Sequence, residues 1–254
     1  GNQGGASGFA DVGGFTGFSG KWRINNGATL RGLRNGGTAW GTNTAADAIT
    51  LNGGTLAVGG ISGAVGNWTW NTPITLATST TSFISDQNVA GTGRYLKMNM
   101  DISGSGNVTF TEPLFSATTF TDLNLGFILT GTNNTLSGTL TIGGPNENGV
   151  AGRLTAVRVG GINQSVNTTT TAGPDGTLGT ASIVNNGWLT FAWTEAHSVT
   201  NPISGTGGIR LGSSGLAGTE NQNVTFVGAK TYTGDTLINR GTLTLGTGGT
   251  INNS

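Results

Sequence analysis

The sequence predicts an all-β solenoid, in which short strands and turns wind into stacked coils. Three observations predict this fold: apolar residues alternate with polar ones in short runs, glycine occurs 48 times in 254 residues, and short motifs recur. Alternation with a period of two is typical of strands with one buried face. Glycine supplies the positive φ of tight turns. Together these features favour a repeat architecture over a compact globular domain.

The strands expected from this alternation are short and fall at intervals along the whole chain. They are bounded by Gly-Gly, Asn-Gly, Ser-Gly or Thr-Gly pairs, which are turn signals. In chain order they are Leu56–Val58, Trp68–Trp70, Ile74–Leu76, Tyr95–Met100, Val108–Phe110, Leu123–Leu129, Leu140–Ile142, Leu154–Val159, Trp188–Trp193, Ile209–Leu211, Val224–Val227, Leu237–Ile238 and Leu243–Leu245. Helical periodicity is nearly absent.

One recurrent motif joins a small hydroxyl residue and glycine to a strand that contains isoleucine. The isoleucine follows the glycine by four positions and is Ile24, Ile142 or Ile238. This even spacing predicts that the three isoleucines occupy the same face of their strands. The three copies are FSGKWRINNG from Phe18, LSGTLTIGG from Leu136 and YTGDTLINRG from Tyr232.

Two further motifs accompany the first. ISGSGNVTF from Ile102 matches ISGTGGIRL from Ile203, and a looser version, ISGAVGNWTW, starts at Ile61. An Asn-Gly pair before a leucine strand recurs in NNGATL, NGGTLAV, NNGWLTF and NRGTLTL. The spacing between copies is irregular, which a solenoid with loops of variable length tolerates better than a propeller. We expect one solenoid over residues 1–254, with coils of roughly 20–25 residues.

The C-terminal repeat resembles a known family. The stretch NVTFVGAKTYTGDTLINRGTLTLGTGG, Asn223 to Gly249, is similar to the autotransporter-associated β-strand repeat, and repeat-like copies lie near 15–33, 101–144 and 202–249. The resemblance implies a right-handed parallel β-helix that is exported as part of a longer chain, often as the passenger of an autotransporter. It also implies a location outside the cell or on the outer surface of a Gram-negative-type bacterium.

Composition excludes several kinds of partner. The formal net charge is zero, 9% of residues are charged, and the basic residues are scattered. Nucleic-acid binding and anionic membrane surfaces need clustered lysine and arginine, so we expect neither. The chain has no cysteine and hence no disulfide or thiolate metal site. No apolar run approaches the roughly 20 residues of a membrane-spanning helix.

Candidate chemistry is sparse in this sequence. The acidic residues Asp101, Asp122, Asp175 and Asp235 are isolated, although neighbouring coils can bring two acids together. His197 and Glu195 lie two positions apart and can share a face as a base and its orienting group, or form a solvated strand end. We expect no catalytic residue, no cofactor and no metal site. The Gly-Pro-Asp-Gly sequence from Gly173 is interpreted as a turn.

Tryptophan supplies the candidate binding residues. Trp68, Trp70, Trp188 and Trp193 are the expected contacts for a glycan or a protein partner, since aromatic rings stack on sugars. The alternative is that these rings fill the solenoid interior.

The function expected from these features is structural. We expect an extracellular surface protein, a component of a fibre, stalk or coat, that associates with copies of itself or with the rest of a longer chain through solenoid ends or faces. The alternative is an adhesin or glycan-binding module, and a polysaccharide-degrading enzyme is the third reading. Because Ser254 follows Leu243–Leu245 so closely, we expect another coil or another copy to cover that end.

Overall fold

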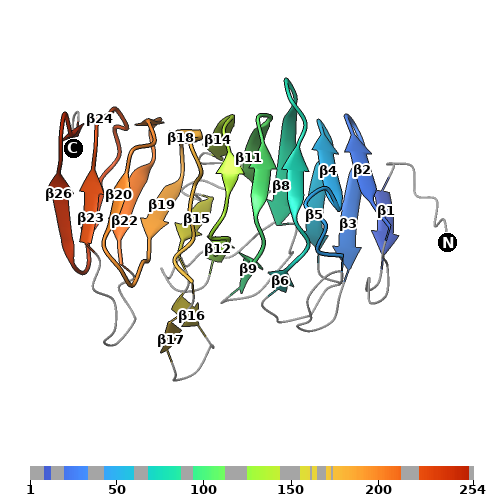
Figure 1. Ribbon diagram of the computed structural model, residues 1–254, viewed down its shortest axis with the longest axis horizontal. Coiled ribbons are helices and arrows are strands. Elements are labelled where there is room, and N and C mark those ends of the chain that lie inside the picture. Colours follow the sequence, from blue (N-terminus) through green and yellow to red (C-terminus); the bar gives the residue numbers. More distant parts are fainter. Residues whose placement is uncertain are drawn as a thin grey trace.

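The computed structural model describes residues 9–12, 20–33, 43–59, 68–86, 94–111, 125–143, 155–160, 162–164, 170–172, 174–212 and 223–251. Every regular element in these residues is a β-strand. The strands lie across the long axis of an elongated rod, with β1 near one end and β26 at the other (Figure 1). The paired strands are parallel except in the hairpin β16-β17. This arrangement confirms the all-β parallel solenoid expected from the sequence.

Three long sheets form the sides of the rod. Sheet 1 has eight strands: β1 (Phe9–Val12), β3 (Thr29–Leu33), β5 (Thr55–Gly59), β8 (Thr81–Asp86), β11 (Asn107–Thr111), β14 (Thr139–Ile142), β18 (Ser182–Asn185) and β21 (Ile203–Ser204). Sheet 2 has five: β2 (Trp22–Asn25), β4 (Ile49–Asn52), β7 (Ile74–Leu76), β10 (Ile102–Gly104) and β13 (Thr135–Leu136). Sheet 3 has seven: β6 (Trp68–Trp70), β9 (Arg94–Met98), β12 (Leu125–Leu129), β15 (Ala156–Val159), β19 (Trp188–Phe191), β22 (Gly208–Leu211) and β25 (Thr236–Ile238).

Smaller sheets complete the C-terminal part. Sheet 4 contains β20 (His197–Val199), β23 (Asn223–Phe226) and β26 (Thr242–Leu245), and sheet 5 contains β24 (Ala229–Lys230) and β27 (Thr250–Ile251). The antiparallel hairpin β16 (Ile162–Gln164) and β17 (Thr170–Ala172) projects from one side of the rod (Figure 1). Residues 123–124 and 154, which belong to two expected strands, lie outside the described residues.

The chain winds by visiting the sheets in turn. From β4 onward it passes through sheets 2, 1 and 3 and returns to sheet 2 one coil further along. Parallel pairing needs a long crossover between partners, and here the rest of each coil supplies it. Beyond β13, the side of the rod formed by sheet 2 is continued first by residues 174–178 and then by sheet 4. The Thr177 amide donates to the Gly131 carbonyl on the preceding coil, and Asp175 contacts His197 of β20 on the next one.

Coil length varies more than the sequence motifs predict. The length of chain between paired residues on adjacent coils measures the length of a coil. This length is intermediate between Ile24 and Leu51, longest between Ile142 and Asn185, where the hairpin is inserted, and shortest between Phe226 and Leu245. Most coils are therefore longer than the expected 20–25 residues. The extra residues lie in loops between strands, where a solenoid accommodates them without disturbing the stack.

The core is a set of ladders in which each inward side chain packs on the equivalent residue of the next coil. In sheet 3, Met98, Leu129, Val159, Phe191 and Leu211 form one such ladder and are all buried. Burying a side chain of this size contributes about 1.5–3 kcal/mol. Each coil needs only a few such residues, which explains how a chain with 34% apolar residues fills its interior.

Glycine explains the ISG motif. Gly104 and Gly205, the glycines of its two clear copies, have φ angles of 100° and 105°. A Cβ atom at Gly104 would overlap the Leu76 carbonyl oxygen of the preceding coil, and one at Gly205 would overlap that of Asn185. Only glycine combines this backbone conformation with such close stacking.

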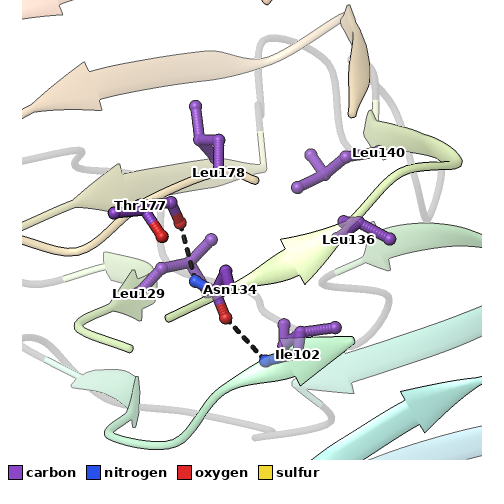
Figure 2. Close-up of a pocket in the computed structure, with 7 residues that line it drawn as sticks. All are labelled: Ile102, Leu129, Asn134, Leu136, Leu140, Thr177 and Leu178. Atoms are coloured by element: carbon purple, nitrogen blue, oxygen red, sulfur yellow. Dashed lines mark hydrogen bonds between the residues drawn. The ribbon is translucent and has the colours of Figure 1, made fainter. Parts of the chain in front are cut away.

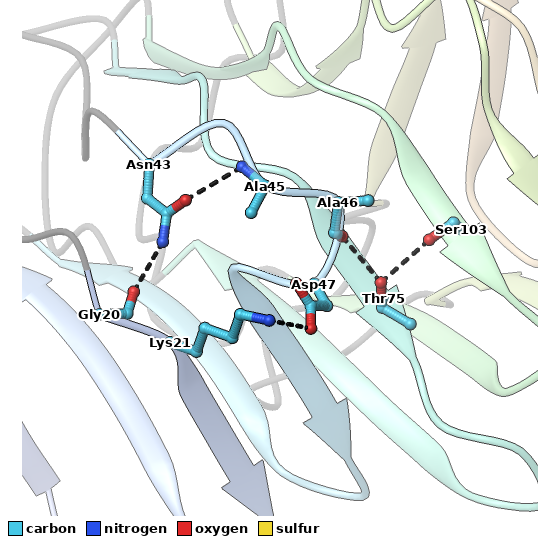
Figure 3. A network of polar contacts seen from close by, with 8 residues as sticks. All are labelled: Gly20, Lys21, Asn43, Ala45, Ala46, Asp47, Thr75 and Ser103. Atoms are coloured by element: carbon cyan, nitrogen blue, oxygen red, sulfur yellow. Dashed lines mark hydrogen bonds and ion pairs between the residues drawn. The ribbon is translucent and has the colours of Figure 1, made fainter.

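Polar side chains tie successive coils together at their corners. Figure 3 shows one such group, in which Asn43 donates to the Gly20 carbonyl and accepts a hydrogen bond from the Ala45 amide. Lys21 Nζ lies 2.5 Å from Asp47 Oδ2, and Thr75 Oγ1 lies 3.0 Å from Ser103 Oγ on the next coil. These groups hold the corner over residues 43–47 against its neighbours.

Candidate functional site

The structure describes the side chains of three of the four tryptophans predicted to contact a ligand, and they occupy two different environments. Trp70 is 1% exposed, and its indole Nε1 donates to the Thr72 carbonyl at 2.8 Å. Trp193 is 4% exposed and donates to the Gly176 carbonyl at 2.9 Å. Neither ring face is open to solvent, so both residues fill the interior, as the alternative interpretation held. The side chain of Trp68 lies outside the described part of the structure.

Trp188 is the half-buried member of the group. The Arg210 guanidinium lies over its ring, with Cζ 3.7 Å from the centroid, which is cation–π geometry. Gly208 pairs with Trp188 across sheet 3, and a Cβ atom there would overlap the indole ring. The ring therefore lies against the backbone of the next coil, and its contacts are with the protein itself.

A carboxylate–imidazole pair joins residues 174–178, which contain Asp175, to His197 at the start of β20. His197 Nε2 is 2.9 Å from Asp175 Oδ2, and the side chains are 33% and 11% exposed. Asp175 Oδ1 accepts hydrogen bonds from the amide and hydroxyl of Thr194, and Oδ2 accepts one from the Glu195 amide. Asp175 thus binds one turn of the next coil through four donors when His197 Nε2 carries a proton.

The chemistry available to this pair is limited by its packing. A carboxylate that orients an imidazole is part of a general base. Here the His197 ring packs on Trp193, with centroids 4.5 Å apart, and Trp193 packs in turn on Phe191. The orienting carboxylate is Asp175, while Glu195 contributes its backbone amide. The hydrogen bonds of Asp175 therefore join two adjacent coils, which is a structural role.

Sequence reasoning missed the role of Asp175 because the partners are 22 positions apart. The only local signal is the Gly-Pro-Asp-Gly sequence from Gly173, a pattern typical of a turn, in which Asp175 is the acidic residue. Among the remaining acids, Asp101 accepts a hydrogen bond from the Asn133 amide. No group of three or more His, Cys, Asp or Glu side chains lies together in the described ranges.

A small cavity lies inside the described part of the rod, between β10, β12, β13, β14 and residues 177–178 (Figure 2). Its lining is mainly leucine and isoleucine, and it has room for about one water molecule. Two polar residues lie at its wall. Asn134 accepts a hydrogen bond from the Ile102 amide and donates to the Gly131 and Thr177 carbonyls, whereas the buried Thr177 hydroxyl has no hydrogen-bond partner. The cavity is a packing gap too small for a metabolite.

The C-terminal coil exposes side chains whose partners on the preceding coil are buried. Ile238 and Leu245 are 52% and 51% exposed, whereas Leu211 and Phe226, with which they pair, are buried. Leu237 is 38% exposed and points to the opposite face of its strand from Ile238. At the other end, Ile24 on the edge strand of sheet 2 is 4% exposed, and Trp70 on the edge strand of sheet 3 is buried. Among the described residues the only other exposed large apolar side chain is Phe83. Within the described part of the chain, the C-terminal coil is therefore an open end, and it is the strongest candidate for a functional surface.

The outer face of sheet 1 is the second candidate surface. Its central row pairs Thr29, Thr55, Phe83, Thr109, Thr141, Val184 and Ser204 across successive strands. Phe83 is 39% exposed, and the row contains no charged residue. An aromatic ring among hydroxyl groups offers stacking together with hydrogen bonds.

Comparison with protein-family models, with curated proteins and with solved structures gives no match. No helix in the described part of the chain is long and apolar enough to cross a membrane.

Proposed function

We propose that this chain is a structural rod that joins other β-solenoid coils through its C-terminal coil. The observation that carries the proposal is the exposure of Ile238 and Leu245, which occupy inward positions. An inward residue becomes buried only when another coil stacks on it. The function is then mechanical, and we propose no catalytic step.

The open end offers both apolar contact and hydrogen bonds. Fully burying a leucine or isoleucine contributes about 1.5–3 kcal/mol, and about half of each terminal side chain is still exposed. The edge strands β25 and β26 also present backbone groups with no neighbouring strand on that side. Such an edge is a template for strand addition.

The partner must present alternating small polar and apolar residues. β26 has the sequence Thr-Leu-Thr-Leu, and β14 has Thr-Leu-Thr-Ile. β14 accepts β18 in parallel register, with Leu140 on Ile183. The surface that β26 offers is thus of the kind that coils of this chain already bind.

A sedimentation experiment tests the proposal. We expect the wild-type chain to associate as its concentration rises, and Ile238→Lys/Leu245→Lys to remain monomeric. Phe83→Lys is the matched control, because it places a lysine at an exposed apolar position far from the end. A wild-type chain that is monomeric at every concentration, with no filaments in electron micrographs, would contradict the proposal.

The place of this rod on the outer surface of a Gram-negative-type bacterium belongs to the same proposal. Its support is the resemblance of residues 223–249 to the autotransporter-associated repeat. Protease treatment of intact cells of the source bacterium tests it, since a surface rod is cleaved while cytoplasmic proteins are not.

A second candidate function is glycan binding by the outer face of sheet 1. The specific observation is the exposed Phe83 ring between Thr55 and Thr109. Neutral polysaccharides suit this row, because its stacking and hydroxyl groups need no charged ligand. Phe83→Ala is expected to abolish binding on a glycan array, while Leu245→Ala leaves it unchanged. Equal binding by both variants would eliminate this candidate.

A further inference from the structure

The corner between β2 and β3 contains an asparagine–glycine pair, Asn26 and Gly27. Both residues are exposed, and a 2.9 Å hydrogen bond from the Ala28 amide to the Asn25 carbonyl closes the turn around them. Gly27 has a φ angle of 78°, and a Cβ atom placed on it would meet no atom within 4 Å. We propose that Asn26 is a modification site, where the side-chain amide is lost as ammonia and the backbone rearranges through a cyclic succinimide.

The reaction needs only water as a co-reactant. The Gly27 backbone nitrogen gives its proton to a hydroxide ion and bonds to Asn26 Cγ, while the bond from Cγ to Nδ2 breaks and the amino group leaves as ammonia with a proton from water. Water then adds to either carbonyl of the succinimide ring and opens it. The products at position 26 are an aspartyl residue and an isoaspartyl residue. Glycine favours the attack, because it has no Cβ atom to obstruct ring closure.

The attack requires a backbone amide that is free of hydrogen bonds and a side chain that can rotate towards it. The Asn26 side chain and the Gly27 amide make no hydrogen bond in the described part of the chain. Exposed turns with few buried contacts are also the parts of a fold that open most readily. The Asn26 corner therefore meets both requirements.

A second asparagine–glycine pair, Asn52 and Gly53, lies on the next coil beside Asn26 and has neither freedom. Asn52 Nδ2 donates to Asn25 Oδ1 at 2.9 Å, and the amide of the buried Gly53 donates to Ser82 Oγ at 3.1 Å. Both hydrogen bonds must break before the ring can close, and the loss of a hydrogen bond in a buried site costs free energy. We therefore expect Asn52 to resist the reaction.

A third pair, Asn186 and Gly187, is held in the same way. Asn186 Oδ1 accepts a hydrogen bond from the Thr206 amide at 3.3 Å, and the amide of the buried Gly187 donates to Asn185 Oδ1 at 3.2 Å. The three pairs contain the same two residue types. Their contacts with neighbouring coils therefore determine which of them reacts.

The modification changes a link between coils. An isoaspartyl residue at position 26 lengthens the main chain between Asn25 and Ala28, whose hydrogen bond closes the turn. The Ala28 carbonyl in turn accepts a hydrogen bond from the Thr55 amide on the next coil at 2.9 Å. Both products also add a negative charge to a chain of zero net charge, so ion exchange separates them from the unmodified protein.

Peptide mass spectrometry of the wild-type chain during incubation at mildly alkaline pH tests the proposal. We expect Asn26 to react at least about tenfold faster than Asn52 and Asn186, which corresponds to a difference of about 1.4 kcal/mol or more in activation free energy. The pairs that begin at Asn35 and Asn148 lie outside the described residues and are followed as separate peptides. Equal rates at Asn26 and Asn52 in the folded chain, or an Asn26 that stays intact, would overturn the proposal.

Two controls assign the difference to the fold. In urea that unfolds the chain, Asn26, Asn52 and Asn186 should react at similar rates, and a difference that persisted there would contradict protection by the structure. Ser82→Ala removes the acceptor of the Gly53 amide and leaves the contacts of Asn26 unchanged. This variant should accelerate the reaction at Asn52 alone. An unchanged rate at Asn52 would contradict the role given to that hydrogen bond.

Discussion

Leu245 stacks directly on Phe226 in sheet 4, yet Phe226 is fully buried and Leu245 is 51% exposed. The two residues occupy the same inward row and differ only in whether a further coil covers them. The same relationship holds between Leu211, which is buried, and Ile238. Local sequence is similar in these pairs, so the difference in burial comes from position along the rod.

This gradient of burial predicts how truncation of leucine affects stability. Leu211→Ala is expected to lower the free energy of unfolding by about 2–5 kcal/mol, because it opens a cavity between two coils. Leu245→Ala is expected to cost less than about 1 kcal/mol at concentrations where the chain is monomeric. Urea unfolding followed by circular dichroism measures both values. Similar losses would show that the terminal coil is covered in solution.

The sequence predicted the faces of the strands better than their environment. The motif spacing predicted that Ile24, Ile142 and Ile238 occupy the same face of their strands, and in the structure Ile24 and Ile142 lie on the inward face and are buried. Ile238 has the same parity but is exposed, because burial in a solenoid depends on the next coil rather than on the strand itself. A sequence motif contains no information about that neighbour.

The contact between Asp175 and His197 was beyond prediction for a related reason. The residues that face each other on adjacent coils depend on coil length, and loops of variable length change it from coil to coil. The hairpin insertion between β15 and β18 adds to this variation just before Asp175. Only a structure gives the register across such an insertion.

Asn185 lies in an inward ladder that is otherwise apolar, where it pairs with Ile142. Its side chain donates to the Gly208 carbonyl at 2.9 Å and accepts from the Gly187 amide at 3.2 Å. Asn185→Leu is expected to destabilise the protein by about 2–4 kcal/mol, because both backbone groups lose a partner in a buried site. Ile142→Leu in the same ladder should cost less than about 1.5 kcal/mol. Chemical denaturation compares them, and equal losses would mean that packing alone matters here.

The hydrogen bonds of Asp175 predict a difference in stability between two aspartate variants. Asp175→Ala removes the acceptor of the Thr194 and Glu195 amides, and we expect a loss of about 2–3 kcal/mol in unfolding free energy. Asp101→Ala removes one hydrogen bond, to the Asn133 amide, and should cost about 1 kcal/mol or less. Thermal and urea unfolding of the two variants provide the test. A larger loss for Asp101→Ala would show that Asp175 does not join the coils.

Lys230 makes stability depend on pH. Its side chain is fully buried, and Nζ donates to the Asn201 and Val227 carbonyls at 2.9 and 2.8 Å. Burial lowers the pKa of Lys230 below its ordinary value of 10.5. Between the folded pKa and 10.5 the unfolded chain therefore binds more protons than the folded chain. The free energy of unfolding contributed by this group rises with pH across that window.

Lys230→Met removes this titration, since methionine is neutral at every pH. The free energy of unfolding of wild type minus that of Lys230→Met is therefore expected to increase as pH rises towards 10.5, and to be constant at pH values well below the folded pKa. Urea unfolding between pH 6 and about pH 10 measures the difference, and Lys21→Met, at an exposed lysine, is the comparison for general effects of charge removal. Parallel pH profiles for wild type and Lys230→Met would contradict the lowered pKa, because the buried ammonium would then titrate as it does in the unfolded chain.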